Sequence, residues 1–173
     1  MWTIGNRSLT QEEMEGNAKE IYTYLSAKGW TNNAIAGLLG NMQTESGCNP
    51  GIWQGLEEDY TRGFGLVQWT PATNYTDWAT ANGYDITDPE GQLKWIDELS
   101  EAKGQWIRTS SYDLSWNDYK ASEESAEYLA SAFLKNFERA GVEVEEERKE
   151  QAKTWYDWLG ESTGVYIVRF VTA

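Results

Sequence analysis

The sequence predicts an α+β fold that is mostly helical, with one small β-hairpin or sheet beside a central helix. Apolar residues recur at helical spacing in several segments, and capping residues or helix-stopping glycines and prolines bound these segments. Residues 51–69 differ, because glycine-rich turns there flank a short apolar run that is typical of a hairpin. The length of 173 residues suits one domain with a substantial core.

Two helices are expected in the first third of the chain. Residues 10–13 read TQEE, a capping box that starts a helix ending at residues 28–29. A second helix begins after Thr31 or Asn32 and ends at residues 47–50, where a glycine and a proline stop it. The apolar stripe of this second helix consists of Ile35, Leu38, Leu39 and Met42.

Four further helices are expected, over residues 70–83, 88–104, 122–137 and 144–159. The first of them has Thr70 as its cap and a proline at its first helical position. Beyond it, residues 165–171 read VYIVRFV, which is typical of a strand. We therefore expect one domain over residues 1–160, followed over residues 161–173 by a strand-like tail or the start of a linker to another domain.

The composition excludes several classes of chemistry. The chain has no histidine, so nucleophile–histidine systems and zinc sites built on histidine are absent. Its one cysteine, Cys48, makes neither an internal disulfide nor a thiolate cluster. Carboxylates, hydroxyls, amides, lysines and arginines remain for catalysis, and we expect no metal and no cofactor.

The charge balance indicates which partners to expect. Acidic residues number 28 against 14 basic ones, a formal net charge of −14. This sign disfavours nucleic acids and anionic membrane surfaces, but it does not disfavour a neutral glycan. No apolar run is long enough to span a membrane, and residues 1–7 lack the pattern of a signal peptide. We expect a protein that does not insert into membranes and leaves its producing cell by lysis or inside a particle.

Glu45 is the first candidate for catalysis. At about 100° per residue it lies beside Leu38 on a helical wheel, so it borders the apolar face of the second helix. Burial disfavours the ionised carboxylate, and so does the partial negative charge at a helix C terminus. A carboxylic acid that keeps its proton is what protonates the leaving oxygen of a glycosidic bond. The alternative is a glutamate whose side chain simply extends into water.

Two segments carry a resemblance to a known family. Residues 39–54 read LGNMQTESGCNPGIWQ, and residues 63–71 read GFGLVQWTP. Together they resemble the phage tail lysozyme family, including lysozyme domains at the tail tip of small Bacillus podophages. The same pattern is similar, more distantly, to goose-type lysozymes and lytic transglycosylases. The resemblance extends over about residues 10–160, and residues 137–139 are similar to the family's segment near the end of the domain.

The resemblance implies a lysozyme-like fold, cleavage of peptidoglycan glycan strands, and Glu45 as the catalytic acid. It implies that residues 65–68 line the sugar cleft, where Gln68 hydrogen-bonds an N-acetyl or hydroxyl group of the substrate. Other residues expected beside the substrate are Trp53, Trp69, Asn74 and Tyr75.

A second carboxylate is left open by the sequence. An inverting hydrolase places its base about 6.5–9.5 Å from its acid, which leaves room for water. Glu58 or Asp59, on the loop that enters the hairpin, is the candidate base, and a solvated loop charge is the alternative for each. A lytic transglycosylase uses one acid–base group, because a hydroxyl of the substrate itself attacks. Both mechanisms remain open.

The leading functional prediction is a muramidase that cuts the β-1,4 bond between N-acetylmuramic acid and N-acetylglucosamine. A lytic transglycosylase acting on the same bond, a glycan-binding module that uses the many tryptophans and tyrosines, and a structural particle component are the alternatives. Because the acidic chain is repelled by anionic cell walls, we expect other phage tail proteins or a fused second wall-degrading domain to place it there. The expected location is the virion tail or, after release, the bacterial cell wall.

Overall fold

The computed structural model describes residues 1–140 and 144–163, and these residues form a mostly helical fold, as expected. In chain order the α-helices in this part of the chain are α1 (Gln11–Ala27), α2 (Asn32–Ser46), α3 (Thr73–Ala81), α4 (Pro89–Leu99), α5 (Trp116–Lys120), α6 (Ala126–Phe133) and α7 (Glu145–Thr163). A short 3-10 helix, η1 (Gln54–Leu56), follows α2, and a π-helix, η2 (Leu134–Glu138), continues α6. The strand expected over residues 165–171 lies outside the described residues.

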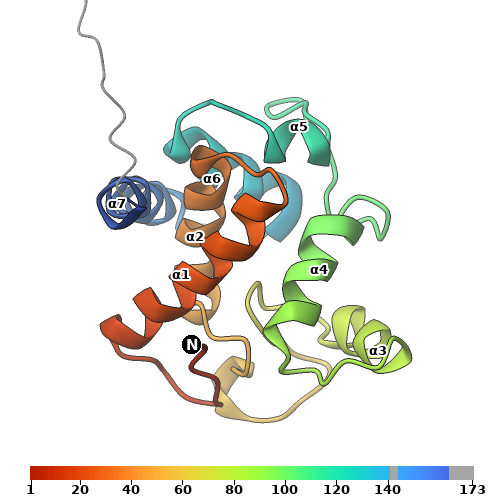
Figure 1. The fold of residues 1–173 in the computed structure, drawn as a ribbon. Helices are drawn as coiled ribbons and strands as arrows, with labels where there is room; N and C mark the ends of the chain where they lie inside the picture. Colours follow the sequence, from red (N-terminus) through yellow and green to blue (C-terminus); the bar gives the residue numbers. More distant parts are fainter. Residues whose placement is uncertain (141–143, 164–173) are drawn as a thin grey trace, which may run out of the picture.

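Helix α2 lies at the centre of the arrangement. It packs against α6 and α7, which also contact each other, and it contacts α1 as well. Helices α3 and α4 pack together on the opposite side of the molecule from α7 (Figure 1). The loop between α2 and α3 therefore lies between two groups of helices, and the end of α2 points into that region.

Two glycines let neighbouring helices approach α2 closely. A Cβ atom on Gly37 would lie 2.9 Å from the Cβ of Leu129 in α6. A Cβ atom on Gly40 would lie 2.6 Å from the backbone oxygen of Arg148 and 2.8 Å from the backbone nitrogen of Ala152 in α7. Because real Cβ atoms do not approach other atoms this closely, only glycine permits these two contacts.

The expected helix boundaries are confirmed most fully at the N-terminal end. Helix α1 has the predicted capping box, and α2 has Thr31 as its N-cap and Gly47 as a left-handed C-cap. Helix α3 begins later than expected, because the hydroxyl of Thr70 donates a hydrogen bond to the backbone oxygen of Gln68 (2.9 Å) instead of capping a helix. Helix α6 likewise begins later, with Ser125 as its cap. Helix α5 was not expected.

The predicted β-hairpin is wrong. Within the described residues there are no strands, and residues 51–69 contain two isolated antiparallel bridges, Trp53 with Phe64 and Phe64 with Trp69. Side-chain amides take up backbone groups that a hairpin ladder would pair. The backbone nitrogen of Leu66 donates to Oε1 of Gln92 in α4 (2.9 Å). Gly65, at φ +80°, turns the chain away from an extended path.

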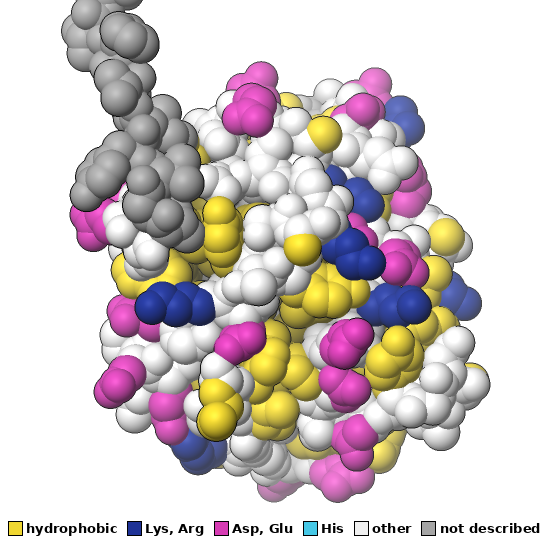
Figure 2. All heavy atoms as spheres, viewed as in Figure 1, with side chains coloured by type: hydrophobic (Ala, Val, Ile, Leu, Met, Phe, Trp, Pro, Cys, Tyr) yellow, Lys and Arg dark blue, Asp and Glu magenta, His cyan; other side chains and the backbone are white. Residues whose placement is uncertain are grey.

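The acidic excess is distributed over the surface. Figure 2 shows acidic side chains over most of the face that it presents, with basic side chains between them. Most of the tryptophans are buried in the core, and aromatic rings pack in a cluster around Trp30, Trp106 and Trp116. No helix in the described ranges combines the length and the apolar character needed to cross a membrane.

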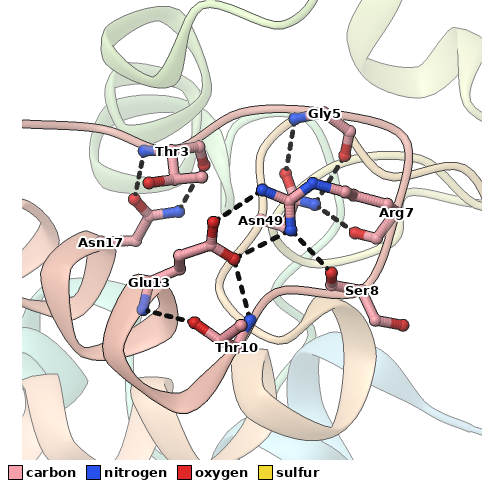
Figure 3. A network of polar contacts seen from close by, with 8 residues as sticks. All are labelled: Thr3, Gly5, Arg7, Ser8, Thr10, Glu13, Asn17 and Asn49. Carbon is pink, nitrogen blue, oxygen red and sulfur yellow. Dashed lines mark hydrogen bonds and ion pairs between the residues drawn. The ribbon is translucent and has the colours of Figure 1, made fainter.

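The turn after α2 is held by the N-terminal segment (Figure 3). Asn49 donates hydrogen bonds from Nδ2 to the backbone oxygens of Gly5 (2.6 Å) and Arg7 (2.8 Å). Asn17 of α1 donates from Nδ2 to the backbone oxygen of Cys48 (2.9 Å). Both asparagines are fully buried, so these bonds satisfy polar groups that have no access to water. The segment therefore fixes the chain as it leaves α2.

Replacing Gly40 with alanine is expected to destabilise the protein by about 1–3 kcal/mol, because the added methyl group overlaps the α7 backbone. Replacing Gly16 is the matched control, since a Cβ there meets nothing within 4 Å and an alanine within α1 favours the helix. Urea unfolding of both variants measures the difference. Equal stability of the two variants would contradict close packing at Gly40.

Candidate active site

A polar cavity of about 560 Å³ opens where α2 ends, beside the loop that precedes α3 and the end of η2. Among the residues that line it are Glu45, Gln68, Trp69, Asn74 and Glu138. The cavity thus joins residues that are far apart in the sequence. It contains two carboxyl groups, and one of these was not expected from the sequence.

Glu45 lies in the last turn of α2, at the floor of the cavity, and its side chain is 19% exposed. The next residue, Ser46, donates a hydrogen bond from its hydroxyl to the backbone oxygen of Leu66 (2.7 Å). That bond fixes the loop wall directly beside Glu45. The serine that follows the glutamate therefore ties the end of α2 to the cavity wall.

Arg148 of α7 is the immediate partner of Glu45. Its Nη2 lies 2.6 Å from Oε1 of Glu45, and its own side chain is only 4% exposed. Its Nη1 donates to Oδ1 of Asn41 (3.0 Å), and Asn41 donates in turn to the backbone oxygens of Gly37 and Ala130 (both 3.0 Å). This chain of buried bonds fixes the guanidinium. The guanidinium thus contacts Glu45 directly, a partner that the sequence did not suggest.

Glu138, the last residue of η2, is the second carboxyl group in the cavity. Its Oε1 is buried and has no hydrogen-bond partner. Burial raises the pKa of the Glu138 carboxyl well above its usual range, and the nearby charge of Glu45 raises it further. Arg148 and Arg139 act in the opposite direction but do not offset burial. Glu138 is therefore a carboxyl group that binds its proton more tightly than an exposed glutamate does.

The cavity thus combines a carboxyl group paired with a cation and a buried carboxyl group whose pKa is raised. Glycoside cleavage uses two carboxyl groups in different environments, because one group must supply a proton and another must be able to accept one. The combination depends on three elements, α2, η2 and α7, that meet only in the folded chain.

Gln68 supports the cavity wall. Its Nε2 donates to the backbone oxygens of Ile52 (3.1 Å) and Gly65 (3.0 Å), which uses both hydrogens of the amide. Only its oxygen remains for a sugar, where it is able to accept but not to donate. Asn74 is exposed at the rim of the cavity, and it donates to the backbone oxygen of Thr70 (3.2 Å).

The three aromatic residues expected beside the substrate are mainly buried. Trp69 lines the cavity but is 2% exposed, and its ring stacks on Tyr75 with the ring centroids 4.4 Å apart. Tyr75 is fully buried behind it, and Trp53 packs against Phe64. Neither Tyr75 nor Trp53 is among the residues that line the cavity. These rings stiffen the wall from behind.

Glu58 and Asp59, the carboxylates considered for the base, are not among the lining residues either. Glu58 is exposed on the loop. Asp59 accepts hydrogen bonds at Oδ1 from the backbone nitrogen (2.9 Å) and the hydroxyl (2.7 Å) of Thr61. These bonds lower the pKa of Asp59 and close a local turn. The structure does not bring the two residues together with Glu45.

Sequence signals for the two missed residues existed. Glu138 follows the apolar stripe of α6 directly, just as Glu45 follows that of α2. Arg148 lies on the buried face of α7, one helical turn before Ala152 and two before Trp155. A charged residue within an apolar stripe needs a partner. Acidic residues surround Arg148 in the sequence, so this stretch resembles a solvent-exposed helix face.

Comparisons with known proteins agree with the resemblance. A family model described as phage tail lysozyme matches residues 16–159, which include Glu45, Glu138 and Arg148. The chain is 45% identical over 173 aligned residues to Morphogenesis protein 1 of Bacillus phage B103. The match covers 98% of this chain and 47% of that protein, so the chain spans about half the length of this curated relative.

Replacing Glu138 with glutamine is expected to stabilise the protein at neutral pH but not in acid. The folded state holds the proton of Glu138 to a pH at which the unfolded chain has released it, so wild-type stability falls as the pH rises from the ordinary value of 4.5 towards the raised pKa. The glutamine variant lacks this fall. Thermal unfolding at about pH 4 and about pH 8 measures it.

The control for this experiment is glutamine at the exposed Glu123, which makes the same charge change on a loop. We expect its melting temperature to follow that of the wild type at both pH values. Parallel curves for wild type and the Glu138 variant would contradict the assignment of a protonated Glu138.

Proposed function

The chain belongs to the phage tail lysozyme family, a family of lysozyme-like cell-wall hydrolases, and from this premise we propose that it is a muramidase that uses Glu45 as its catalytic acid. The proposed substrate is the glycan strand of peptidoglycan. The bond cut is the β-1,4 linkage between N-acetylmuramic acid and N-acetylglucosamine. Residues 1–160 form the catalytic domain in this proposal.

One observation carries the proposal: Glu45 lies at the end of a buried helix and faces a polar cavity with a fixed cation behind it. The walls of the cavity carry amide and hydroxyl side chains, such as those of Gln54, Gln105 and Thr70. Groups of this kind suit a neutral, polyhydroxylated chain. The buried contacts of Arg148 hold the carboxyl group in one orientation, which a proton donor needs.

In the proposed reaction Glu45 protonates the oxygen that leaves, and the bond between that oxygen and the anomeric carbon breaks. In hydrolysis a water molecule adds its hydroxyl to the anomeric carbon and releases a proton to a carboxylate. In a lytic transglycosylase a hydroxyl of the muramic acid attacks instead and forms an anhydro ring. Two carboxyl groups in one cavity favour the hydrolytic course, and transglycosylation is the alternative.

We propose that the protein acts as part of a virion, where it opens the cell wall during entry. The support is the family and the phage relative, whose name refers to morphogenesis. The net charge of −14 does not attract the protein to an anionic wall. Other tail proteins, or a second wall-degrading domain in the same polypeptide, would then place the cleft on its substrate.

Replacing Glu45 with glutamine is expected to reduce the rate of peptidoglycan clearing at least about 100-fold, because the amide has no proton to donate. Clearing of purified peptidoglycan measures the rate, and mass spectrometry of the products distinguishes reducing ends from anhydro ends. Glutamine at Glu123 is the matched control and should clear at the wild-type rate. Equal clearing by the Glu45 variant and the wild type would exclude the proposed acid, and binding without cleavage by the wild type would indicate a glycan-binding module.

Salt is expected to increase activity on intact walls that carry anionic polymers. Screening shortens the range of the repulsion between these polymers and the acidic protein, since the Debye length falls to about 10 Å at 0.1 M salt. Clearing rates at low and moderate salt, on intact walls and on peptidoglycan stripped of the polymers, measure the effect. A steep fall in activity on intact walls between these salt concentrations would show that charge attraction drives binding.

A further inference from the structure

We infer that Glu138 is the second carboxyl group of the reaction, and that Glu45, Glu138 and Arg148 form one cluster that retains a single proton for glycan cleavage. The inference rests on the proposed function, because it assigns a role within the same site. It also predicts how the two carboxyl groups titrate in the protein without substrate. Glu138 acts through Glu45 and is therefore a positioning residue.

The first support is the way the fold orients Glu138. Arg139, the next residue, has a left-handed backbone at φ 48°, which ends η2 and turns the chain sharply. Its guanidinium donates to the backbone oxygens of Gln105 and Asn136, the latter at 2.7 Å. This side chain is held at the cavity rim, whereas the carboxyl group of Glu138 lies inward with a buried oxygen. A residue with a bulky side chain is strained in the left-handed region, so the surrounding structure must hold this turn in place.

The second support is the imbalance of charges around the two carboxyl groups. Arg148 from α7 is bonded to Glu45 from α2, and Oε1 of Glu138 has no partner. The charged groups that act on Glu138 are Glu45, Arg148 and, at the rim, Arg139. With both carboxyl groups ionised, one buried cation would face two anions. Retaining one proton removes the second buried charge, which costs less than ionising it.

The third support is that the cluster is coupled to the helix framework. Asn41 holds Arg148 from the side opposite Glu45. Arg148 therefore does not rotate towards Glu138 without losing buried hydrogen bonds. Both terminal nitrogens of the guanidinium are thus bonded to Asn41 and Glu45, and neither Nε of Arg148 nor Oε1 of Glu138 has a hydrogen-bond partner.

Before cleavage Arg148 is paired with Glu45, and Glu138 is the carboxyl group whose pKa is raised. Because two interacting carboxyl groups titrate as a unit, the proton is shared within the pair. During cleavage the proton passes from Glu138 to Glu45 and from Glu45 to the leaving oxygen, which leaves both carboxyl groups ionised. The water that adds its hydroxyl to the anomeric carbon returns one proton to the pair. The cluster therefore begins and ends each cycle with one proton.

A substrate-free titration tests the shared proton. Carbon-13 NMR of the glutamate carboxyl carbons is followed against pH in the wild type and in the Glu45→Gln and Glu138→Gln variants. The signal that disappears in Glu138→Gln should remain protonated in the wild type at pH values at which the exposed glutamates have already ionised. Its midpoint should fall by about one pH unit or more in Glu45→Gln, because the neighbouring negative charge is lost. A Glu138 signal that titrates like an exposed glutamate, or that ignores the Glu45 substitution, overturns the inference.

The dependence of clearing on pH then tests the action of Glu138 through Glu45. In Glu138→Gln the alkaline limb of the profile should move to lower pH by about one unit, because the pair no longer retains its proton. Glu138→Asp, which keeps a carboxyl group, should restore part of the shift. A loss of activity that is equal at every pH would indicate a structural role and overturn the inference. The NMR result stands even if no glycan is cleaved, so failure of the proposed function is recognised separately.

Discussion

The close approach of α7 to α2 is the constraint on which the site depends. Gly40 permits it, because any side chain at this position would meet the backbone of α7 at Arg148. Gly37 permits the corresponding approach of α6 on another side of the same helix. As a result a guanidinium from α7 and a carboxyl group from the end of η2 both reach the last turn of α2. The chemistry of Glu45 is thus set by helix packing at a distance from the cavity.

This packing buries an arginine, and a buried arginine needs partners. Asn41 and Glu45 supply them, and removing one partner of a buried ion pair typically costs about 3–5 kcal/mol. Glu45 is therefore part of the interior of the protein as well as part of the cavity. The same residue contributes to stability through Arg148 and to function through its open side.

The loop wall opposite Glu45 is built from side-chain amides instead of strands. Gln92 accepts from the backbone of Leu66 and donates to that of Pro50 (2.7 Å), while Ser46 binds the other polar group of Leu66. Glycine-rich turns that flank a short apolar run predicted a hairpin, in which the backbone groups of two neighbouring strands would pair. Here a residue of α4, 26 positions away in the sequence, takes one of them. No pattern in the neighbouring sequence predicts long-range side-chain hydrogen bonds of this kind.

The sequence by itself determined the helices with strong local signals: the capping box of α1, the N-cap and glycine stop of α2, and the apolar stripes that face the core. It also indicated that Glu45 is a helix-end acid, and the absence of histidine excluded nucleophile–histidine systems and zinc sites built on histidine. Only the tertiary structure decided what surrounds Glu45, because Glu138 and Arg148 lie more than 90 residues away and reach it through packing. Local periodicity reports which face of a helix is buried, but it does not report which charges from other helices share that face.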